Sequence, residues 1–275
     1  MVVGLKLVVG LKRHMRAVRR TINRANARLL PRGGFDFAFQ FLILFACYYV
    51  YRLVRGLASG REVTAFSNAR HIMNAEKALH IYIEPWLQAK VSHTESLLQF
   101  FNFVYIQVHL PVTVGCLVWI YVRRRDAFAF FRNWFLAMNG LALVCFALLP
   151  TAPPRLLPTS GIVDTLFLFS SSNLHTGAAG WFTNPFAAVP SLHIGYALFV
   201  SLTIFALARG RLMRVLAVIY PCVVLLGIII TGNHFLLDAL AGVLVVGVAY
   251  LFALNVSAVG VGEPLPATWR DAQSQ

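Results

Sequence analysis

The chain has 275 residues, of which 59% are hydrophobic and 12% are charged. A soluble domain carries about 25% charged residues, so this composition excludes an ordinary soluble protein. The formal net charge of +14 is typical of nucleic-acid-binding proteins, but the basic residues form clusters that alternate with long apolar runs. We therefore expect an integral membrane protein whose basic clusters set its topology and contact anionic lipid, with no nucleic-acid partner.

Apolar runs of about 20 residues, enough to cross the hydrocarbon core of a bilayer, recur along the chain. The predicted fold class is all-α: a polytopic integral membrane protein built as a bundle of six transmembrane helices with interfacial helices beside it. The six spans are expected at about 36–55, 98–122, 133–150, 187–208, 212–231 and 236–254.

Composition divides the chain into three regions. Residues 1–34 contain many Lys and Arg residues and no acid, which predicts a cytoplasmic amphipathic helix on the inner leaflet. Residues 35–256 form the predicted membrane domain. Residues 257–275 contain Pro264 and Pro266 and are expected to be disordered.

The basic clusters indicate how the predicted helices are oriented. Besides residues 6–32, Lys and Arg gather at 123–132 and at 209–214. Even numbers of predicted helices separate the three clusters, so all three lie on one side, which the positive-inside rule makes cytoplasmic. We expect cytoplasmic termini and a plasma-membrane location.

Two connecting stretches then fall on the outer side. In residues 56–97, apolar residues recur at helical spacing between charged ones, which predicts one or two interfacial helices. Residues 150–186 are rich in Pro, Ser, Gly and Thr and show no evident secondary structure in the sequence. Loops of this length in compact proteins are commonly functional.

The same topology brings four distant residues to the outer boundary: Arg155, His193, His234 and Asp238. Ionisable groups at the edge of the hydrocarbon are unfavourable, so each is a candidate functional residue. Their agreement in position is independent of any argument about chemistry, because the charge clusters alone set the topology.

His234 and Asp238 are four residues apart, so on a helix they share a face. The carboxylate is expected to accept a hydrogen bond from one imidazole nitrogen, which fixes the tautomer and makes the other nitrogen a better nucleophile. Two other interpretations stay open for the pair. It occurs in helices by chance, and it also serves as a proton relay in transporters.

His193 follows Pro190 and Ser191 at a predicted helix start, where proline and serine are favoured. The free amides and positive dipole of such a helix end favour a phosphate, with Ser191 as a capping and phosphate-binding residue. His193 beside it suits proton transfer to a leaving alkoxide. The guanidinium of Arg155 suits phosphate oxygens, although an anchor at the membrane interface is the alternative.

The sequence contains no metal-binding pattern, so we expect neither a metal nor another cofactor. Asp164 and Asp238 are the only acids between residues 126 and 263, and no zinc-ligand spacing is present. Among the other histidines, His109 lies in a predicted span, where a buried hydrogen-bonded role is expected. His175, in the outer loop, is a weaker candidate for the site.

At these residues the chain resembles the type 2 phosphatidic acid phosphatase (PAP2) superfamily, and within it the branch of inositol phosphorylceramide synthases. The segments that carry the resemblance are 186–193 (FAAVPSLH) and 234–242 (HFLLDALAG). The resemblance implies six transmembrane helices and a metal-independent reaction through a phosphohistidine. It also implies His234 as nucleophile, Asp238 as its orienting residue and His193 as acid and base.

Two positions depart from the family pattern. The pattern places a lysine seven residues before the arginine that Arg155 matches, and an arginine six residues before the nucleophile. Here these positions are Leu148 and Ile228. A phosphate monoester carries close to two negative charges and a diester one, so a site with fewer cations favours a diester donor.

The sequence therefore predicts a membrane-embedded phosphotransferase on the extracytoplasmic face. It would move a phosphoryl or phospho-alcohol group, for example inositol phosphate, from a phospholipid or polyprenyl phosphate to an acceptor alcohol. A lipid phosphate or pyrophosphate phosphatase that uses water as acceptor is the alternative. A transporter or lipid-binding scaffold is the non-enzymatic alternative, and the oligomeric state stays open.

Overall fold

The computed structural model describes residues 33–57, 61–169 and 186–258, and almost all of these residues are helical. Within them the only β-type pairing is an isolated bridge between Thr151 and Ala187, in keeping with the predicted all-α class. The predicted N-terminal amphipathic helix and the C-terminal tail fall mainly in 1–32 and 259–275, outside the described residues. His175 also lies outside them.

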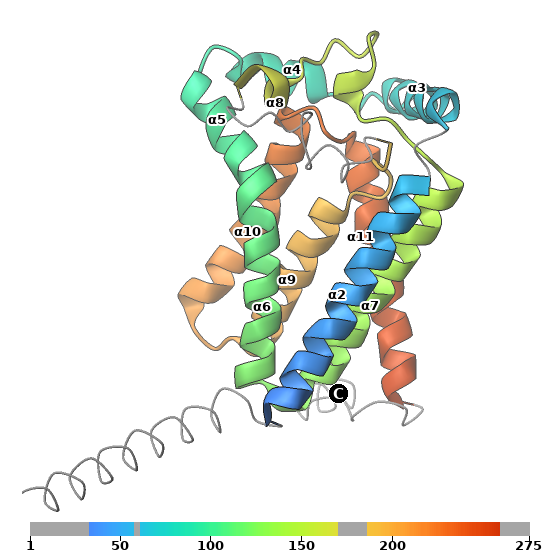
Figure 1. Cartoon of the computed structure of the whole chain (residues 1–275). Helices are drawn as coiled ribbons and strands as arrows, with labels where there is room; N and C mark the ends of the chain where they lie inside the picture. Colours follow the sequence, from blue (N-terminus) through green and yellow to red (C-terminus); the bar gives the residue numbers. More distant parts are fainter. Residues whose placement is uncertain (1–32, 58–60, 170–185, 259–275) are drawn as a thin grey trace, which may run out of the picture.

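Four helical stretches in the described part of the chain are long and apolar enough to cross a membrane. Two more helices run beside them, but their apolar stretches, 34–46 and 192–207, are shorter. Figure 1 shows all six side by side as one bundle. The four long stretches are α5–η2–α6 (Glu95–Phe103, Val104–Val108 and His109–Arg123), α7 (Arg125–Leu148), α10 (Arg211–Ile230) and α11 (Leu236–Ala258), and the shorter two are α2 (Gly33–Leu57) and α9 (Leu192–Leu207).

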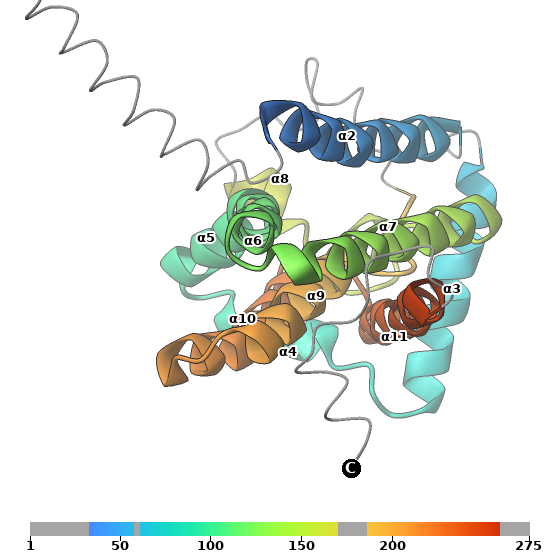
Figure 2. The ribbon, with the colours of Figure 1, turned by 90° about the horizontal axis from the view of Figure 1, so that it is seen from below.

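Helix α9 is the centre of the bundle, because it contacts α6, α7, α10 and α11, as the view along the helices shows (Figure 2). Its Phe199 is fully buried and packs edge-on against Trp134 of α7 at a ring-centroid distance of 5.2 Å. The indole N–H of Trp134 donates to the carbonyl of Val246 in α11, 3.0 Å away. Close packing of this kind holds helices together where lipid supplies no hydrophobic driving force.

Helix α2 packs on α7 and is tied down by polar side chains near its start. The hydroxyl of Tyr121 donates to Asp36 at 2.8 Å, and the guanidinium of Arg132 donates to Gln40 at 2.6 Å. The third span was predicted to begin at 133, after Arg132, but α7 begins at Arg125. The charge of Arg132 does not end the helix because Gln40 and its neighbour Asn133 satisfy it.

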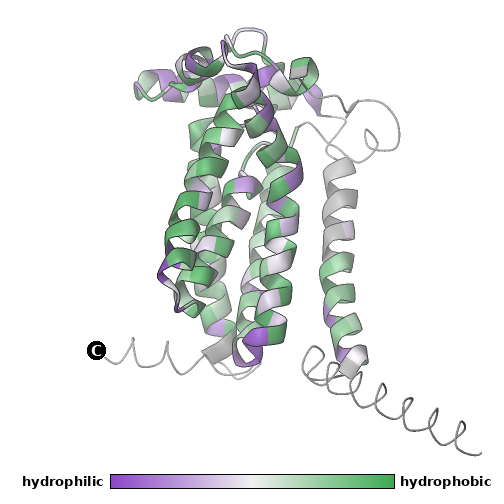
Figure 3. Ribbon diagram, turned by 90° about the vertical axis from the view of Figure 1, so that its left-hand side faces the viewer, coloured by the Kyte–Doolittle hydropathy of each residue, from purple (hydrophilic) through white to green (hydrophobic). Residues whose placement is uncertain are grey.

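Two helices lie across one end of the bundle, α3 (Glu62–Ala78) and α4 (Glu84–Val91). They mix polar and apolar residues, whereas the bundle below them is mostly apolar (Figure 3). Residues 150–169 join them there and are more structured than expected, with a 3-10 turn, η3 (Pro154–Leu156), and a short helix, α8 (Thr165–Phe169). We call this the site end of the bundle.

The opposite end carries the α6–α7 and α9–α10 connections (Figure 1). These connections contain the arginines of residues 123–125 and 209–211, and we call this the basic end. The separation of the two basic clusters from Arg155, His193, His234 and Asp238 therefore agrees with the predicted topology.

Candidate active site

Two helix beginnings meet at the site end, those of α9 and α11. The amide of Ser191, the N-cap of α9, donates to the carbonyl of Asp238 at 2.9 Å. One turn further along α11, a Cβ on Gly242 would lie 2.5 Å from the carbonyl oxygen of Ser191. Only a residue without a side chain fits at 242, so this glycine sets how closely the two helices approach.

His234 lies in the turn that joins α10 to α11, not on the helix itself. Gly232 begins this turn with φ +68, a backbone conformation that glycine adopts at little cost. The imidazole is buried, and its Nδ1 lies 3.0 Å from the carbonyl oxygen of Ala188. Asp238 is farther away, with its Oδ2 at 3.5 Å from Nδ1.

The expected Asp238–His234 hydrogen bond is therefore only partly present. Asp238 is the third residue of α11, and its Oδ2 accepts the amide N–H of Phe235 at 2.9 Å. This is the carboxylate half of a capping box, which fixes the first turn of a helix. The two side chains lie at ion-pair distance, 3.5 Å apart, but they do not share a helical face because the helix begins two residues after His234.

The tautomer of His234 follows from its shorter contact. A carbonyl oxygen only accepts, so Nδ1 carries the proton that points at Ala188. The lone pair of the neutral imidazole is then on Nε2. The nitrogen expected to be held by Asp238 has a backbone carbonyl as its nearer partner, and the nucleophilic role of the other nitrogen stays a prediction.

His193 lies beside His234, with ring centroids 5.5 Å apart. The ring of Tyr105 also stacks on His193, at a centroid distance of 4.2 Å, and His109 lies 4.6 Å from His193. Tyr105 belongs to the π-helical segment η2, and π-helical turns occur frequently at functional sites. A π-helical turn holds one residue more than an α-helical turn. It therefore changes which side chains of the α5–η2–α6 stretch face His193.

His109 extends this series of rings toward the centre of the bundle. Tyr196 of α9 stacks on it with centroids 5.2 Å apart and ring planes 5° from parallel. The Nδ1 atom of His109 is buried and has no hydrogen-bond partner among the described residues. The hydrogen bond expected for a buried His109 is thus missing at this nitrogen.

Ser191 occupies the N-cap position of α9 as predicted, but its side chain does not cap the helix. It is fully buried, and its hydroxyl oxygen has no hydrogen-bond partner in the described part of the chain. The amides of Leu192 and Ile194 in the first turn likewise have no acceptor among the described residues. The start of α9 therefore offers hydrogen-bond donors to an anion.

Arg155 lies against the turn that contains His234. Its amide donates to the carbonyl of Gly232 at 2.9 Å, and its guanidinium donates to the side chain of Asn233. On the other side, its Nε pairs with Asp164 at 3.2 Å. The structure thus brings Arg155 to the predicted site and shows two partners, Asn233 and Asp164, that the sequence analysis did not assign.

Two further residues at the site were missed by the sequence analysis. Glu84 of α4 accepts the amide N–H of Leu236 at 2.8 Å, and Glu76 of α3 accepts that of Leu237 at 2.7 Å. Both glutamates are fully buried. No sequence signal separates them from exposed acids such as Glu62 in the same stretch, because burial here depends on how α3 and α4 dock.

The two positions that depart from the family pattern supply no cation. Ile228 is buried in α10, and Leu148 is exposed at the end of α7. Arg61 approaches this end of α7 and donates to the carbonyl of Ala147. Within the described residues, no group of three His, Cys, Asp or Glu side chains is arranged to hold a metal ion.

Comparison with known proteins gives one match. A family model described as the PAP2 superfamily matches residues 70–252, which is more than half of the chain and includes Arg155, Ser191, His193, His234 and Asp238. It does not distinguish the branch within the superfamily, so the likeness to inositol phosphorylceramide synthases stays a prediction. Neither the search of curated proteins nor that of solved structures produced a match.

Proposed function

The chain belongs to the PAP2 superfamily, and we propose that it is a membrane-embedded phosphotransferase that uses His234 as its nucleophile. Members of this superfamily are phosphatases or phosphotransferases that act on lipid phosphates. One observation carries the proposal. The Nδ1 proton of His234 is held by a backbone carbonyl at 3.0 Å, and the ring of His193 lies 5.5 Å away.

The reaction has two steps that mirror each other. In the first, Nε2 of His234 attacks the phosphorus of a lipid phosphodiester, a P–N bond forms, and the P–O bond to the leaving alcohol breaks. Protonated His193 gives its proton to the departing oxygen. In the second, the acceptor hydroxyl attacks the phosphorus, His193 takes its proton, and the P–N bond breaks.

The start of α9 is the proposed binding site for the phosphate oxygens. The amides of Leu192 and Ile194 have no acceptor, and the hydroxyl of Ser191 has no partner, among the described residues, and a helix N-terminus attracts anions. Arg155 stabilises the neighbouring turn through Asn233. Its guanidinium is partly neutralised by Asp164, so the site suits the single charge of a diester better than a monoester.

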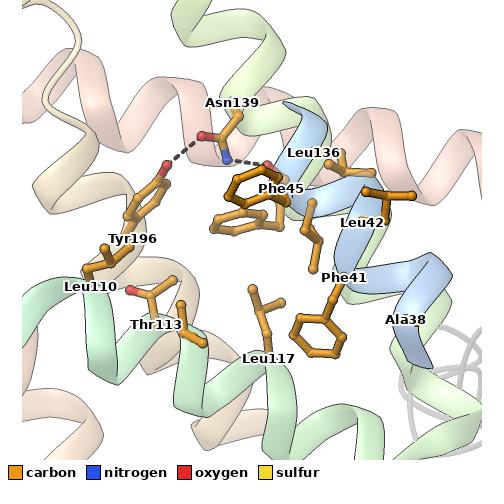
Figure 4. Close-up of a pocket in the computed structure, with 13 residues that line it drawn as sticks. Ala38, Phe41, Leu42, Phe45, Leu110, Thr113, Leu117, Leu136, Asn139 and Tyr196 are labelled. Carbon is orange, nitrogen blue, oxygen red and sulfur yellow. Dashed lines mark hydrogen bonds between the residues drawn. The ribbon is translucent and has the colours of Figure 1, made fainter. Parts of the chain in front are cut away.

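An apolar pocket of about 600 Å³ supports a lipid substrate, since ligand pockets measure about 300–1,000 Å³. It lies between α2, α6, α7 and α9, and Tyr196 joins its wall to the His109–His193 rings. Figure 4 shows Tyr196 hydrogen-bonded to Asn139 on one side, while Thr113 and apolar side chains line the rest. We propose that it holds the hydrocarbon chain of the lipid.

Six membrane crossings and an extracytoplasmic site are part of the same proposal. All six helices of the bundle run between the site end and the basic end (Figure 1). The arginines at the basic end make that end cytoplasmic by the positive-inside rule. α9 is short for a span, with 16 residues, but it packs against α6, α7, α10 and α11.

Hydrolysis with water as the acceptor is a second candidate, and Arg61 favours it. This residue lies at the end of α7, beside the position where the family pattern has a lysine. If its guanidinium turned toward the phosphate, the site would gain the second cation that a monoester needs.

Product analysis distinguishes these functions. Purified protein in nanodiscs would receive phosphate-labelled phosphatidylinositol, phosphatidic acid or a polyprenyl diphosphate, each with and without acceptor alcohols, beside His234→Ala. A new labelled lipid that depends on both acceptor and His234 is the expected result. Free phosphate from a monoester would establish the phosphatase instead. Turnover unchanged by His234→Ala would contradict both and leave a transporter or scaffold.

A further inference from the structure

We propose that Glu76 and Glu84 are positioning residues that hold His234 in place by binding the first amides of α11. This inference rests on the proposed function, because it concerns the nucleophile of that reaction. Neither glutamate touches His234 in the contacts described above. They act through the backbone that immediately follows it.

The contacts are specific to the first turn of the helix. Asp238 accepts the amide of Phe235, Glu84 that of Leu236 and Glu76 that of Leu237, at 2.9, 2.8 and 2.7 Å. Three consecutive amides that directly follow His234 are thus bound by three carboxyl groups. Amides at a helix start have no partner within the helix, so these side chains decide where α11 begins.

Two of the three carboxyl groups come from outside the bundle. Glu76 is near the end of α3 and Glu84 is at the start of α4, and both helices lie across the site end (Figure 1). The docking of α3 and α4 is therefore coupled to the position of His234. Gln88, one turn after Glu84, strengthens this docking by donating to the carbonyls of Val163 and Ile230.

A proton shared between the two glutamates would remove the repulsion between two buried carboxylates. Each has a second oxygen, Oε2, that is buried and has no donor among the described residues. Burial and the neighbouring Glu84 raise the pKa of Glu76 to about 9, so at neutral pH Glu76 carries a proton. Shared with Glu84, this proton provides a donor where two bare carboxylates would repel each other.

The N-termini of α9 and α11 therefore have different roles at the site. The first amides of α11 are occupied by carboxyl groups and are therefore not available to a phosphate. The amides of Leu192 and Ile194 at the start of α9 have no such partner in the described part of the chain. The substrate phosphate is therefore directed to α9, while α11 is fixed as the support of the nucleophile.

Kinetic measurements on matched variants test the assignment. Glu76→Ala and Glu84→Ala should each lower kcat by about tenfold or more with little change in KM, because the nucleophile loses its position while the substrate site remains. Glu76→Gln keeps an acceptor for Leu237 and a donor for Glu84 and should restore kcat to within about threefold of wild type. Glu62→Gln, an exposed acid of the same helix, is the control and should match wild type.

A second measurement does not depend on the reaction. Backbone hydrogen exchange of residues 234–238 should become about tenfold faster in Glu76→Ala and Glu84→Ala, but not in Glu76→Gln or Glu62→Gln. Unchanged exchange or wild-type kcat in folded alanine variants would overturn the assignment. If the wild-type protein shows no His234-dependent turnover, the proposed function fails, and the exchange data still decide whether these glutamates position the turn.

Discussion

The imidazole of His234 is held more closely by the carbonyl oxygen of Ala188 than by the carboxylate of Asp238, at 3.0 Å against 3.5 Å. In enzymes where a carboxylate alone fixes the histidine, its loss puts the proton on the wrong nitrogen and lowers kcat by about 10⁴. In this protein the backbone of Ala188 defines the tautomer, and Asp238 has a second role at the start of α11.

Asp238→Asn should therefore lower kcat less than a substitution that removes control of the His234 tautomer. The asparagine oxygen still accepts the amide of Phe235, and Ala188 still holds the Nδ1 proton. We expect kcat to fall by about 10- to 100-fold, compared with several orders of magnitude for His234→Ala. Turnover of labelled lipid in nanodiscs measures both. Equal losses in the two variants would show that the carboxylate, not Ala188, controls the tautomer.

His193→Asn should lower kcat by about 10²–10⁴-fold for a natural lipid substrate, because the alkoxide then leaves without a proton. A substrate with a p-nitrophenyl leaving group needs little help from an acid, so its first step should be much less affected. Release of p-nitrophenol in a single turnover measures that step directly. An equal loss with both substrates would contradict the role of His193 as the general acid.

Gly242→Ala should destabilise the protein by about 1–3 kcal/mol, the usual effect of overpacking, because the new Cβ would meet the carbonyl oxygen of Ser191 at 2.5 Å. Gly247 is a matched control on the same helix, since nothing lies within 4 Å of its Cβ position. Thermal unfolding in detergent compares the two. A melting temperature as low in Gly247→Ala would mean that helix propensity or lipid contact, not the clash, is responsible.

Leu110→Trp should fill the apolar pocket and raise KM about fivefold or more for a long-chain substrate, while leaving KM for a short-chain analogue nearly unchanged. Leu110 lines the pocket and is about half exposed, at 48%. Leu202 has a similar exposure of 47% on α9 but does not line the pocket, so Leu202→Trp is the control. If KM depended on chain length in the same way in both variants, the pocket would not be the binding site of the lipid chain.

The raised pKa of Glu76 predicts how stability depends on pH. Because its pKa is about 9 in the folded protein and the ordinary value for a glutamate is 4.5, the folded state binds the extra proton between these values. Stability from this group is thus complete below about pH 4.5 and falls as the pH rises toward 9. Neighbouring Glu84, Asp238 and Tyr82 share this environment.

Glu76→Gln should remove much of this pH dependence, since an amide does not ionise. We expect the melting temperature of wild type to fall by about 5 °C or more between pH 6 and pH 9, and that of the variant to fall less. Thermal unfolding across this range, with Glu62→Gln as control, measures the difference. Parallel curves for wild type and Glu76→Gln would show that Glu76 does not carry the proton.

Much of the architecture was predictable because it follows from local chemistry. Long apolar runs form helices in a membrane, where every backbone amide needs an internal partner, and the four long spans, together with α2 and α9, occupy nearly the predicted ranges. The basic clusters likewise predicted which ends of the helices lie together. The gathering of Arg155, His193, His234 and Asp238 at one end of the bundle followed from this topology alone.

The contacts that organise the site were decided by the tertiary structure. Ala188 contributes a backbone carbonyl, which every residue has, so its role could not be predicted from the residue type. Glu76 and Glu84 resemble the exposed Glu62, and only the docking of α3 and α4 buries them against α11. A sequence determines which groups exist and which segments are apolar, whereas the distances between groups on different helices depend on how those helices pack.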